Sequence, residues 1–135
     1  MRRVEANRKQ IVIEFCVNGV KKVDIYINPS FPGGCRKIHE ALAYDVAVAQ
    51  KTLEAIKGDD KQTAIVDYLQ GKFDVAMKLI DGIAEAIGPG QYEEIAEYLP
   101  AIDIGDLTAL AVAIVESYSE FYAKTLKEGF KKNGQ

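Results

Sequence analysis

The chain of 135 residues has no tryptophan, one histidine (His39) and two cysteines, Cys16 and Cys35. Two cysteines cannot build a disulfide framework, and these two do not form a Cys-x-x-Cys pair. One bridge is conceivable, but a reduced intracellular protein is the simpler interpretation. A metal centre needs three or four ligands, which one histidine and two separated cysteines do not supply convincingly. We therefore expect no metal and no cofactor.

Long apolar runs and a strong net charge are also missing. The longest apolar run, "LTALAVAIV" from Leu107 to Val115, is far shorter than a membrane span. The N-terminus lacks the apolar run of a signal peptide. A net charge of -3 leaves no fold-wide basic surface for nucleic acid. These absences predict a cytoplasmic protein whose partners are neither membranes nor nucleic acids.

What the chain does contain is enough apolar sequence, 48% of its residues, for the core of one domain. The sequence predicts an α+β fold, with an N-terminal β-hairpin followed by a bundle of three to four helices. We expect a flexible basic arm over 1–10, a single domain over 11–128 and a polar tail over 129–135. The predicted hairpin spans 11–28, and the predicted helices span about 36–57, 62–87, 91–99 and 104–128.

The predicted hairpin turns at Asn18-Gly19, the strongest short sequence signal for such a turn. The odd-numbered apolar residues form one row on each strand. A two-residue loop would pair odd positions with even ones and would split the two rows between opposite faces of the sheet. A three-residue loop over 17–19, with Gly19 in a left-handed bulge position, keeps both rows on one face, and we expect this loop. The expected cross-strand pairs are then Ile13 with Val23 and Glu14 with Lys22.

Apolar residues at 3-4 spacing predict the helices and indicate which side of each helix is apolar. The first stripe consists of Ile38, Leu42, Val46, Ala49, Leu53 and Ile56. The second consists of Ile65, Leu69, Phe73, Ala76, Ile80, Ile83 and Ile87. Within the second stripe, Gly71 marks either a break or a close packing contact. Candidate N-caps are Asp59 or Asp60 for the second helix and Asp103 or Asp106 for the last one.

Gly88-Pro89-Gly90 raises the question of a phosphate-binding loop. A Walker loop needs Lys and then Ser or Thr after its last glycine, whereas Gln91 and Tyr92 follow here. A dinucleotide-binding loop follows a strand, whereas a predicted helix precedes these glycines. Glu93 and Glu94 would also repel an anion at the next helix N-terminus. We interpret the glycines as a boundary between two helices.

Two clusters invite a catalytic interpretation. Cys35 and His39 are four residues apart on one helical face, and a position near the helix N-terminus would lower the pKa of Cys35. No orienting Asn or Asp and no oxyanion donor accompanies them in the sequence. Three glutamates of the next-to-last helix alternate with apolar residues, as on a solvated face, although paired carboxylates can perform acid–base chemistry. We therefore expect no catalytic residues and no enzymatic activity.

The C-terminal half, "IDGIAEAIGPGQYEEIAEYLPAIDIGDLTALAVAIVESYSEFYAKTLKEGF", carries a longer pattern. An Ile-Asp-x-Ile helix end runs into a glycine pair, and a Tyr-x-x-Ile helix, a short connector and a long amphipathic helix follow. With the strand pair and its Asn-Gly turn at the front, this pattern resembles the tail assembly chaperones of long-tailed phages and of prophages in Gram-positive bacteria. The resemblance covers roughly residues 9 to 130.

The resemblance implies an assembly factor that binds the tape measure protein, keeps that long apolar helical chain soluble and helps to recruit tail tube protein. Such a factor acts in the host cell cytoplasm and is not expected in the mature virion. The long apolar stripes can line a groove for a helical partner, and self-association into a homo-oligomer is expected. The candidate partner-binding residues are aromatic, although those of the last helix are more often core residues: Tyr92, Tyr98, Tyr118, Phe121 and Tyr122.

Two other classes of function stay open. One is another small oligomeric protein-binding or regulatory domain of bacterial or phage origin, also without enzymatic activity. The other is a small enzyme that uses Cys35 and His39 or the glutamates, which would require a deep polar pocket.

Overall fold

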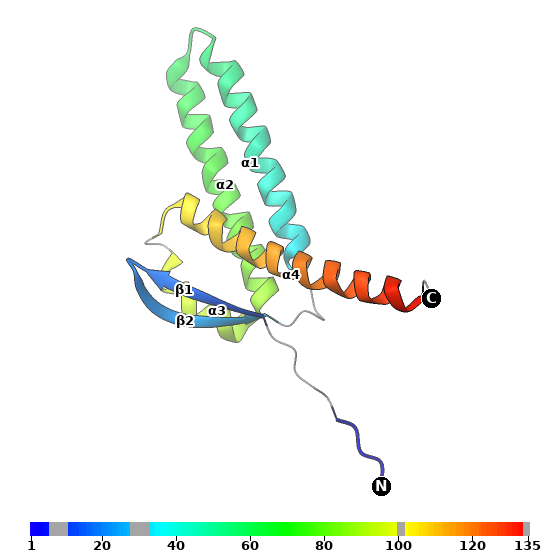
Figure 1. Cartoon of the computed structure of the whole chain (residues 1–135). Helices are drawn as coiled ribbons and strands as arrows, with labels where there is room; N and C mark the ends of the chain where they lie inside the picture. Colours follow the sequence, from blue (N-terminus) through cyan, green and yellow to red (C-terminus); the bar gives the residue numbers. More distant parts are fainter. Residues whose placement is uncertain (6–10, 28–32, 100–101, 134–135) are drawn as a thin grey trace.

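The computed structural model describes residues 1–5, 11–27, 33–99 and 102–133, and in them a β-hairpin precedes four helices (Figure 1). This arrangement confirms the predicted α+β fold. The strands are β1 (Ile11–Val17) and β2 (Val20–Ile27). The helices are α1 (Cys35–Ile56), α2 (Lys61–Ile87), α3 (Pro89–Ala96) and α4 (Ile104–Asn133).

The ends of the predicted elements differ slightly from those in the structure. The helix α3 begins two residues before its predicted start at 91 because Pro89 fits the first turn, where its missing N–H is not needed. The helix α4 continues to Asn133, past the predicted end at residue 128 and into the segment that we expected to be a tail. Residues 1–5 have no regular structure, and the second half of the predicted basic arm, residues 6–10, lies outside the described residues.

The turn of the β-hairpin corrects the sequence prediction. Asn18 and Gly19 have φ values of 53° and 79°, and they form a two-residue turn between Val17 and Val20. A two-residue turn of type I′ needs positive φ at both positions, which Asn and Gly tolerate best. The prediction of a three-residue loop over 17–19 is therefore wrong.

A β-bulge next to the turn restores the pairing of odd positions with odd ones. Phe15 pairs with Val23 and Cys16 with Lys21, so Lys22 is the extra residue between them. The predicted pairs of Ile13 and Glu14 are shifted by two residues, because Ile13 pairs with Ile25 and Glu14 with Asp24. Since the bulge changes the parity of the register, both apolar rows still reach one face. On that face Phe15, Ile25 and Ile27 are buried.

The helices α1 and α2 form a long antiparallel hairpin of their own (Figure 1). At its base the backbones approach closely: a Cβ on Gly34 would lie 2.2 Å from the carbonyl oxygen of Gly82. At mid-length, a Cβ on Gly71 would lie 2.7 Å from Cγ1 of Val48, so Gly71 marks close packing rather than a break. Asp60 begins α2 as its N-cap, because its carboxylate accepts a hydrogen bond of 3.0 Å from the backbone N–H of Thr63.

The core lies at the base of this helical hairpin, where β2, α3 and α4 pack against the C-terminal half of α2. The largest fully buried side chains there are Ile25, Ile27, Ile38, Leu79, Ile83, Ile95, Ile114 and Val75. Tyr118 of α4 joins them, and its hydroxyl donates a hydrogen bond of 3.3 Å to the carbonyl oxygen of Ala86. Figure 1 shows α4 crossing this base, whereas the other halves of α1 and α2 project beyond it.

The segment Gly88-Pro89-Gly90 ends α2 and starts α3, as expected for a boundary between helices. It also places Gln91 beside the outer edge of β2. The side-chain amide of Gln91 accepts a hydrogen bond from the N–H of Tyr26 and donates one to the carbonyl oxygen of the same residue, both at 2.6 Å. The amide thus replaces a neighbouring strand at this point of the edge. At the start of α4, the Asp103 carboxylate accepts a hydrogen bond of 2.8 Å from the N–H of Asp106.

Candidate partner-binding surface

The five aromatic residues predicted to bind a partner do not form one exposed surface. Tyr118 is only 4% exposed and belongs to the core, which corrects its placement as a surface residue. Burial, with smaller contributions from Cys35 and Tyr122, raises the pKa of Tyr118 to about 12. A buried phenol on α4 packs well there because its hydroxyl still finds a carbonyl acceptor.

The other four predicted residues lie in three separate places. Tyr98 follows α3 and is half-buried, with its ring 6.2 Å from that of Phe15 and the Lys22 ammonium 5.8 Å from its centre. Phe121 and Tyr122 stack edge to face on α4, with ring centres 5.5 Å apart. Tyr92 of α3 lines a shallow, mainly apolar hollow, which these residues of α2 also line: Met77, Lys78, Ile80, Asp81 and Ala84.

A much larger apolar surface lies on α2, mainly on its distal half, which projects beyond the core, and it extends past the middle of the helix to Met77. Five large apolar side chains there are each more than half exposed. They are Ile65 (51%), Val66 (58%), Leu69 (61%), Phe73 (59%) and Met77 (52%). We call this set the α2 outer face.

Helix geometry explains why these side chains share one side of α2. Gly71 faces α1, because its neighbour there is Val48. At about 100° per residue, Leu69 and Phe73 then point away from α1. Four members of the face, Ile65, Leu69, Phe73 and Met77, are spaced by four residues and form a single ridge along the helix. The arc of α2 that these side chains span contains no Asp, Glu, Lys or Arg, and Lys72 lies just beyond that arc, next to Ile65.

The same side of α2 is covered farther along the helix. Ile83 and Ile87 continue the stripe at the base and are buried in the core. The hollow that contains Tyr92 lies between the exposed and the buried parts, since Met77 and Ile80 line it. Apolar surface therefore continues from the tip of α2 to Tyr92, which is the one predicted residue that the structure joins to this face.

The distal half of the helical hairpin is held together from within. Lys72 of α2 and Asp45 of α1 form an ion pair of 2.8 Å, and both side chains are about three-quarters buried. The Asp45 carboxylate raises the pKa of Lys72, and the Lys72 ammonium lies 5.8 Å from the centre of the Tyr68 ring. Together with the contact of Gly71 and Val48, this pair keeps the side chains of the α2 outer face turned away from α1.

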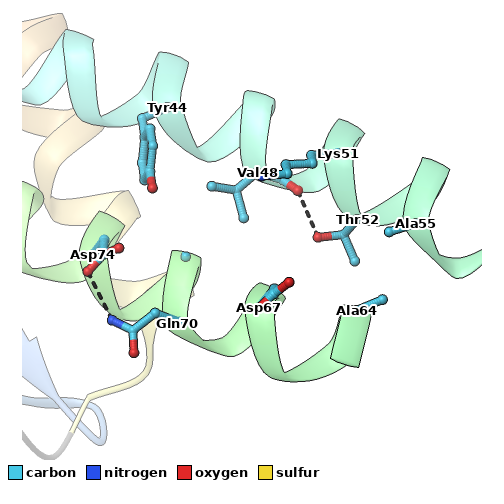
Figure 2. Close-up of a pocket in the computed structure, with 10 residues that line it drawn as sticks. Tyr44, Val48, Lys51, Thr52, Ala55, Ala64, Asp67, Gln70 and Asp74 are labelled. Carbon is cyan, nitrogen blue, oxygen red and sulfur yellow. Dashed lines mark hydrogen bonds between the residues drawn. The ribbon is translucent and has the colours of Figure 1, made fainter. Parts of the chain in front are cut away.

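The seam between the two helices carries a hollow of different character (Figure 2). This hollow has a volume of about 320 Å³ and is open to solvent. Tyr44 and Lys51 come from α1, and Asp67, Gln70 and Asp74 come from α2. Gln70 donates a hydrogen bond of 3.2 Å to Asp74, so part of this polar lining is already paired. The lining of this hollow is thus mixed, with polar side chains beside Val48, Ala55 and Ala64, whereas the outside of α2 is apolar.

The candidate catalytic pair does not gain the properties of a nucleophile and its base. Cys35 begins α1 and is half-buried, and burial raises the pKa of its thiol. That direction is opposite to the lowering expected for a thiol near a helix N-terminus, because desolvation of the thiolate prevails. His39 is exposed on α1, and Glu93, Glu94 and Glu97 are exposed on and after α3. Cys16 and Cys35 are both free thiols.

Within the ranges that the structure describes, neither a cluster of metal ligands nor a membrane-spanning helix occurs. In those ranges, no three His, Cys, Asp or Glu side chains gather closely enough to hold one metal ion. No helix in the same ranges combines the length and the apolar character that crossing a bilayer requires.

The predicted stripe contained three of the five residues of the α2 outer face but did not distinguish them from the core. Ile65, Leu69 and Phe73 follow the same spacing as Ile83 and Ile87, and spacing alone does not say which part of a stripe is covered. The chain matches no known family model, no curated protein and no solved structure.

Proposed function

We propose that the protein is a tail assembly chaperone of a long-tailed phage or prophage, and that its α2 outer face binds apolar helical segments of the tape measure protein. The observation that carries the proposal is the exposed ridge Ile65, Leu69, Phe73 and Met77. Exposed apolar patches of several hundred Å² mark interaction sites on soluble proteins. The named class of partner comes from the sequence resemblance of the C-terminal half.

The physical fit between the face and this partner supports the proposal. A ridge of residues four apart packs into the groove between the same ridges of another helix, which is the commonest mode of helix–helix packing. An amphipathic helix of the partner would therefore bury its own apolar side against α2. The absence of charge within this arc of α2 favours an apolar segment, since a charged one would lose its hydration without compensation.

In this role the protein acts by binding and not by catalysis. It covers apolar helical segments of the tape measure protein until the tail tube assembles around them, and it assists that assembly in the host cytoplasm. Several copies bind along one long partner, and they leave before the virion is complete. The hollow in Figure 2 lies between α1 and α2, away from the α2 outer face, and takes no part in this step.

Co-expression tests the proposal. The chain is produced together with the tape measure protein encoded in the same genome, and the soluble fraction of the tape measure protein is measured. We expect the wild-type chain to raise that fraction and Leu69→Asp to abolish the gain, because the new carboxylate would be buried on binding. Leu53→Asp is the matched control, since Leu53 is 65% exposed on α1 and lies outside the α2 outer face.

A lack of any gain in solubility with the wild-type chain would contradict the chaperone proposal. The genes next to that of this chain give an independent check. A tail tube gene on one side and a very long, helix-rich gene on the other would support the assignment. If both are missing, the alternative is a small oligomeric binding or regulatory domain that uses the same face for another partner.

A further inference from the structure

We infer that, in the absence of its partner, a second copy of this chain covers the α2 outer face, as a twofold dimer in which two α2 helices cross through the ridge Ile65, Leu69, Phe73 and Met77. The dimer itself follows from the face and does not depend on the proposed function. The partner would then displace the second copy, and only this displacement rests on the proposed function.

The size of the face matches what a stable dimer buries. Its five large side chains are more than half exposed, so each offers about 100 Å² and the face about 500 Å² of apolar surface. About three-fifths of a typical dimer interface is apolar. The face therefore corresponds to about 800 Å² of total surface on each copy, which is the size of a standard stable interface.

The ridge is complementary to itself. In a twofold contact the same surface serves both copies, so the ridge of residues four apart meets an identical ridge. Two such ridges interdigitate when the helices cross at about −50°. The middle of the ridge lies at residue 71, halfway between Ile65 and Met77, so a twofold axis there brings Leu69 against Phe73 of the second copy.

Charge does not oppose this contact. The arc of α2 that the ridge occupies contains no ionisable residue, and Lys72, which lies next to that arc, is paired with Asp45 within one copy. The net charge of -3 on each chain is small, so the repulsion between two copies is weak at physiological ionic strength. The second copy thus meets apolar atoms without stranding a charge.

The projecting shape of the helical hairpin gives the second copy access. Figure 1 shows the distal halves of α1 and α2 clear of α4 and of the β-hairpin. A helix from another copy can therefore lie across α2 without first displacing part of the fold. A partner helix of similar character would compete for the same ridge, so the dimer would keep the face out of water until the partner arrives.

The test measures molar mass by light scattering and sedimentation on the full chain at micromolar concentration. We expect a mass near twice 14.9 kDa for the wild type and for the control Leu53→Asp. Leu69→Asp and Phe73→Asp should each raise the dissociation constant about 100-fold or more and give monomers, because two carboxylates would be buried in each dimer. Circular dichroism establishes that the variants keep their helices.

A cysteine cross-link tests the geometry of the dimer. In a Cys16→Ser background, Phe73→Cys should give a covalent dimer on mild oxidation, because the twofold axis passes close to this residue. Tyr44→Cys should not give a covalent dimer, since Tyr44 lines the hollow between α1 and α2 and not the ridge (Figure 2). A monomeric wild type, or dimers that persist in Leu69→Asp, would overturn the inference. Neither result bears on the solubility of the tape measure protein, so the two proposals fail separately.

Discussion

Ile65 and Ile83 are the same residue on the same side of one helix, eighteen residues or five full turns apart, yet Ile83 is fully buried and Ile65 is 51% exposed. The difference lies in what covers them. At the base, β2, α3 and α4 pack on α2 together with α1, whereas among the described residues Figure 1 shows α1 alone beside the distal half. One apolar stripe thus supplies a folding core at one end and an exposed apolar surface at the other.

The largest expected effect concerns the close backbone contact at the base. In Gly34→Ala the new Cβ would lie 2.2 Å from the Gly82 carbonyl oxygen, at a residue whose φ is 87°. Crowding and left-handed strain together should lower the free energy of unfolding by about 4 kcal/mol, as measured by urea denaturation. Gly19→Ala is the control, because Gly19 has a φ of 79° and nothing within 4 Å. Equal losses in the two variants would mean that the contact at the base is not tight.

The next prediction separates the two halves of α2 directly. Ile83→Ala should lower the free energy of unfolding by about 3 kcal/mol, because it leaves a cavity among buried side chains. Ile65→Ala removes the same atoms from the exposed half and should cost about 0.5 kcal/mol or less. Both are measured by urea denaturation at a protein concentration low enough for the wild type to be monomeric.

The cost of Ile65→Ala shows whether the distal half of α2 is exposed in the monomer. If Ile65→Ala cost as much as Ile83→Ala in the monomer, the distal half would have to be covered by the chain itself. A cost for Ile65→Ala that appears only at higher protein concentration would instead indicate contact between copies.

A smaller effect is expected from the burial of Tyr118 at the base. The pKa of Tyr118 is about 12 in the folded chain, against about 10 in an unfolded one. The folded state therefore favours the neutral phenol, and this contribution to stability is complete below pH 10 and is lost as the pH rises to 12. We expect the wild type to lose about 2 kcal/mol more than Tyr118→Phe over this interval in pH-dependent denaturation. Parallel curves for the two proteins would show that the phenol is not shielded.

Several features of the fold could be predicted from the sequence because their causes are local. Asn18-Gly19 indicated the hairpin turn, and Asp60 and Asp103 were among the candidate caps that the structure uses. Gly88-Pro89-Gly90 was recognised as a boundary between helices. Each of these depends on the conformation or hydrogen bonding of a few adjacent residues.

The register of the β-hairpin could not be predicted, because two arrangements satisfy the same alternation. A three-residue loop and a two-residue turn with a bulge both bring the odd rows to one face. The structure uses the second arrangement, with Lys22 as the extra residue. Gln91 was missed for a related reason: its amide meets Tyr26 only because α3 lies beside β2, and 65 residues separate the two in the chain.

The aromatic residues predicted to bind a partner do not coincide with the exposed apolar surface of α2. Aromatic residues were chosen because they dominate many interfaces, yet Tyr118 packs in the core and the exposed surface consists mainly of aliphatic residues and Phe73. Every residue of the ridge except Met77 belonged to a stripe visible in the sequence. No local pattern states whether another element covers a stripe.

The sequence by itself determined the hairpin, the helices and the side of each helix that is apolar, because backbone geometry and residue spacing act over a few residues. Only the tertiary structure decided which part of the α2 stripe became core and which part became surface. That outcome depends on where α3, α4 and the β-hairpin pack, and they reach only the base of α2. The exposed half exists because helix length is set locally, whereas burial is set by the limited extent of the elements that pack against it.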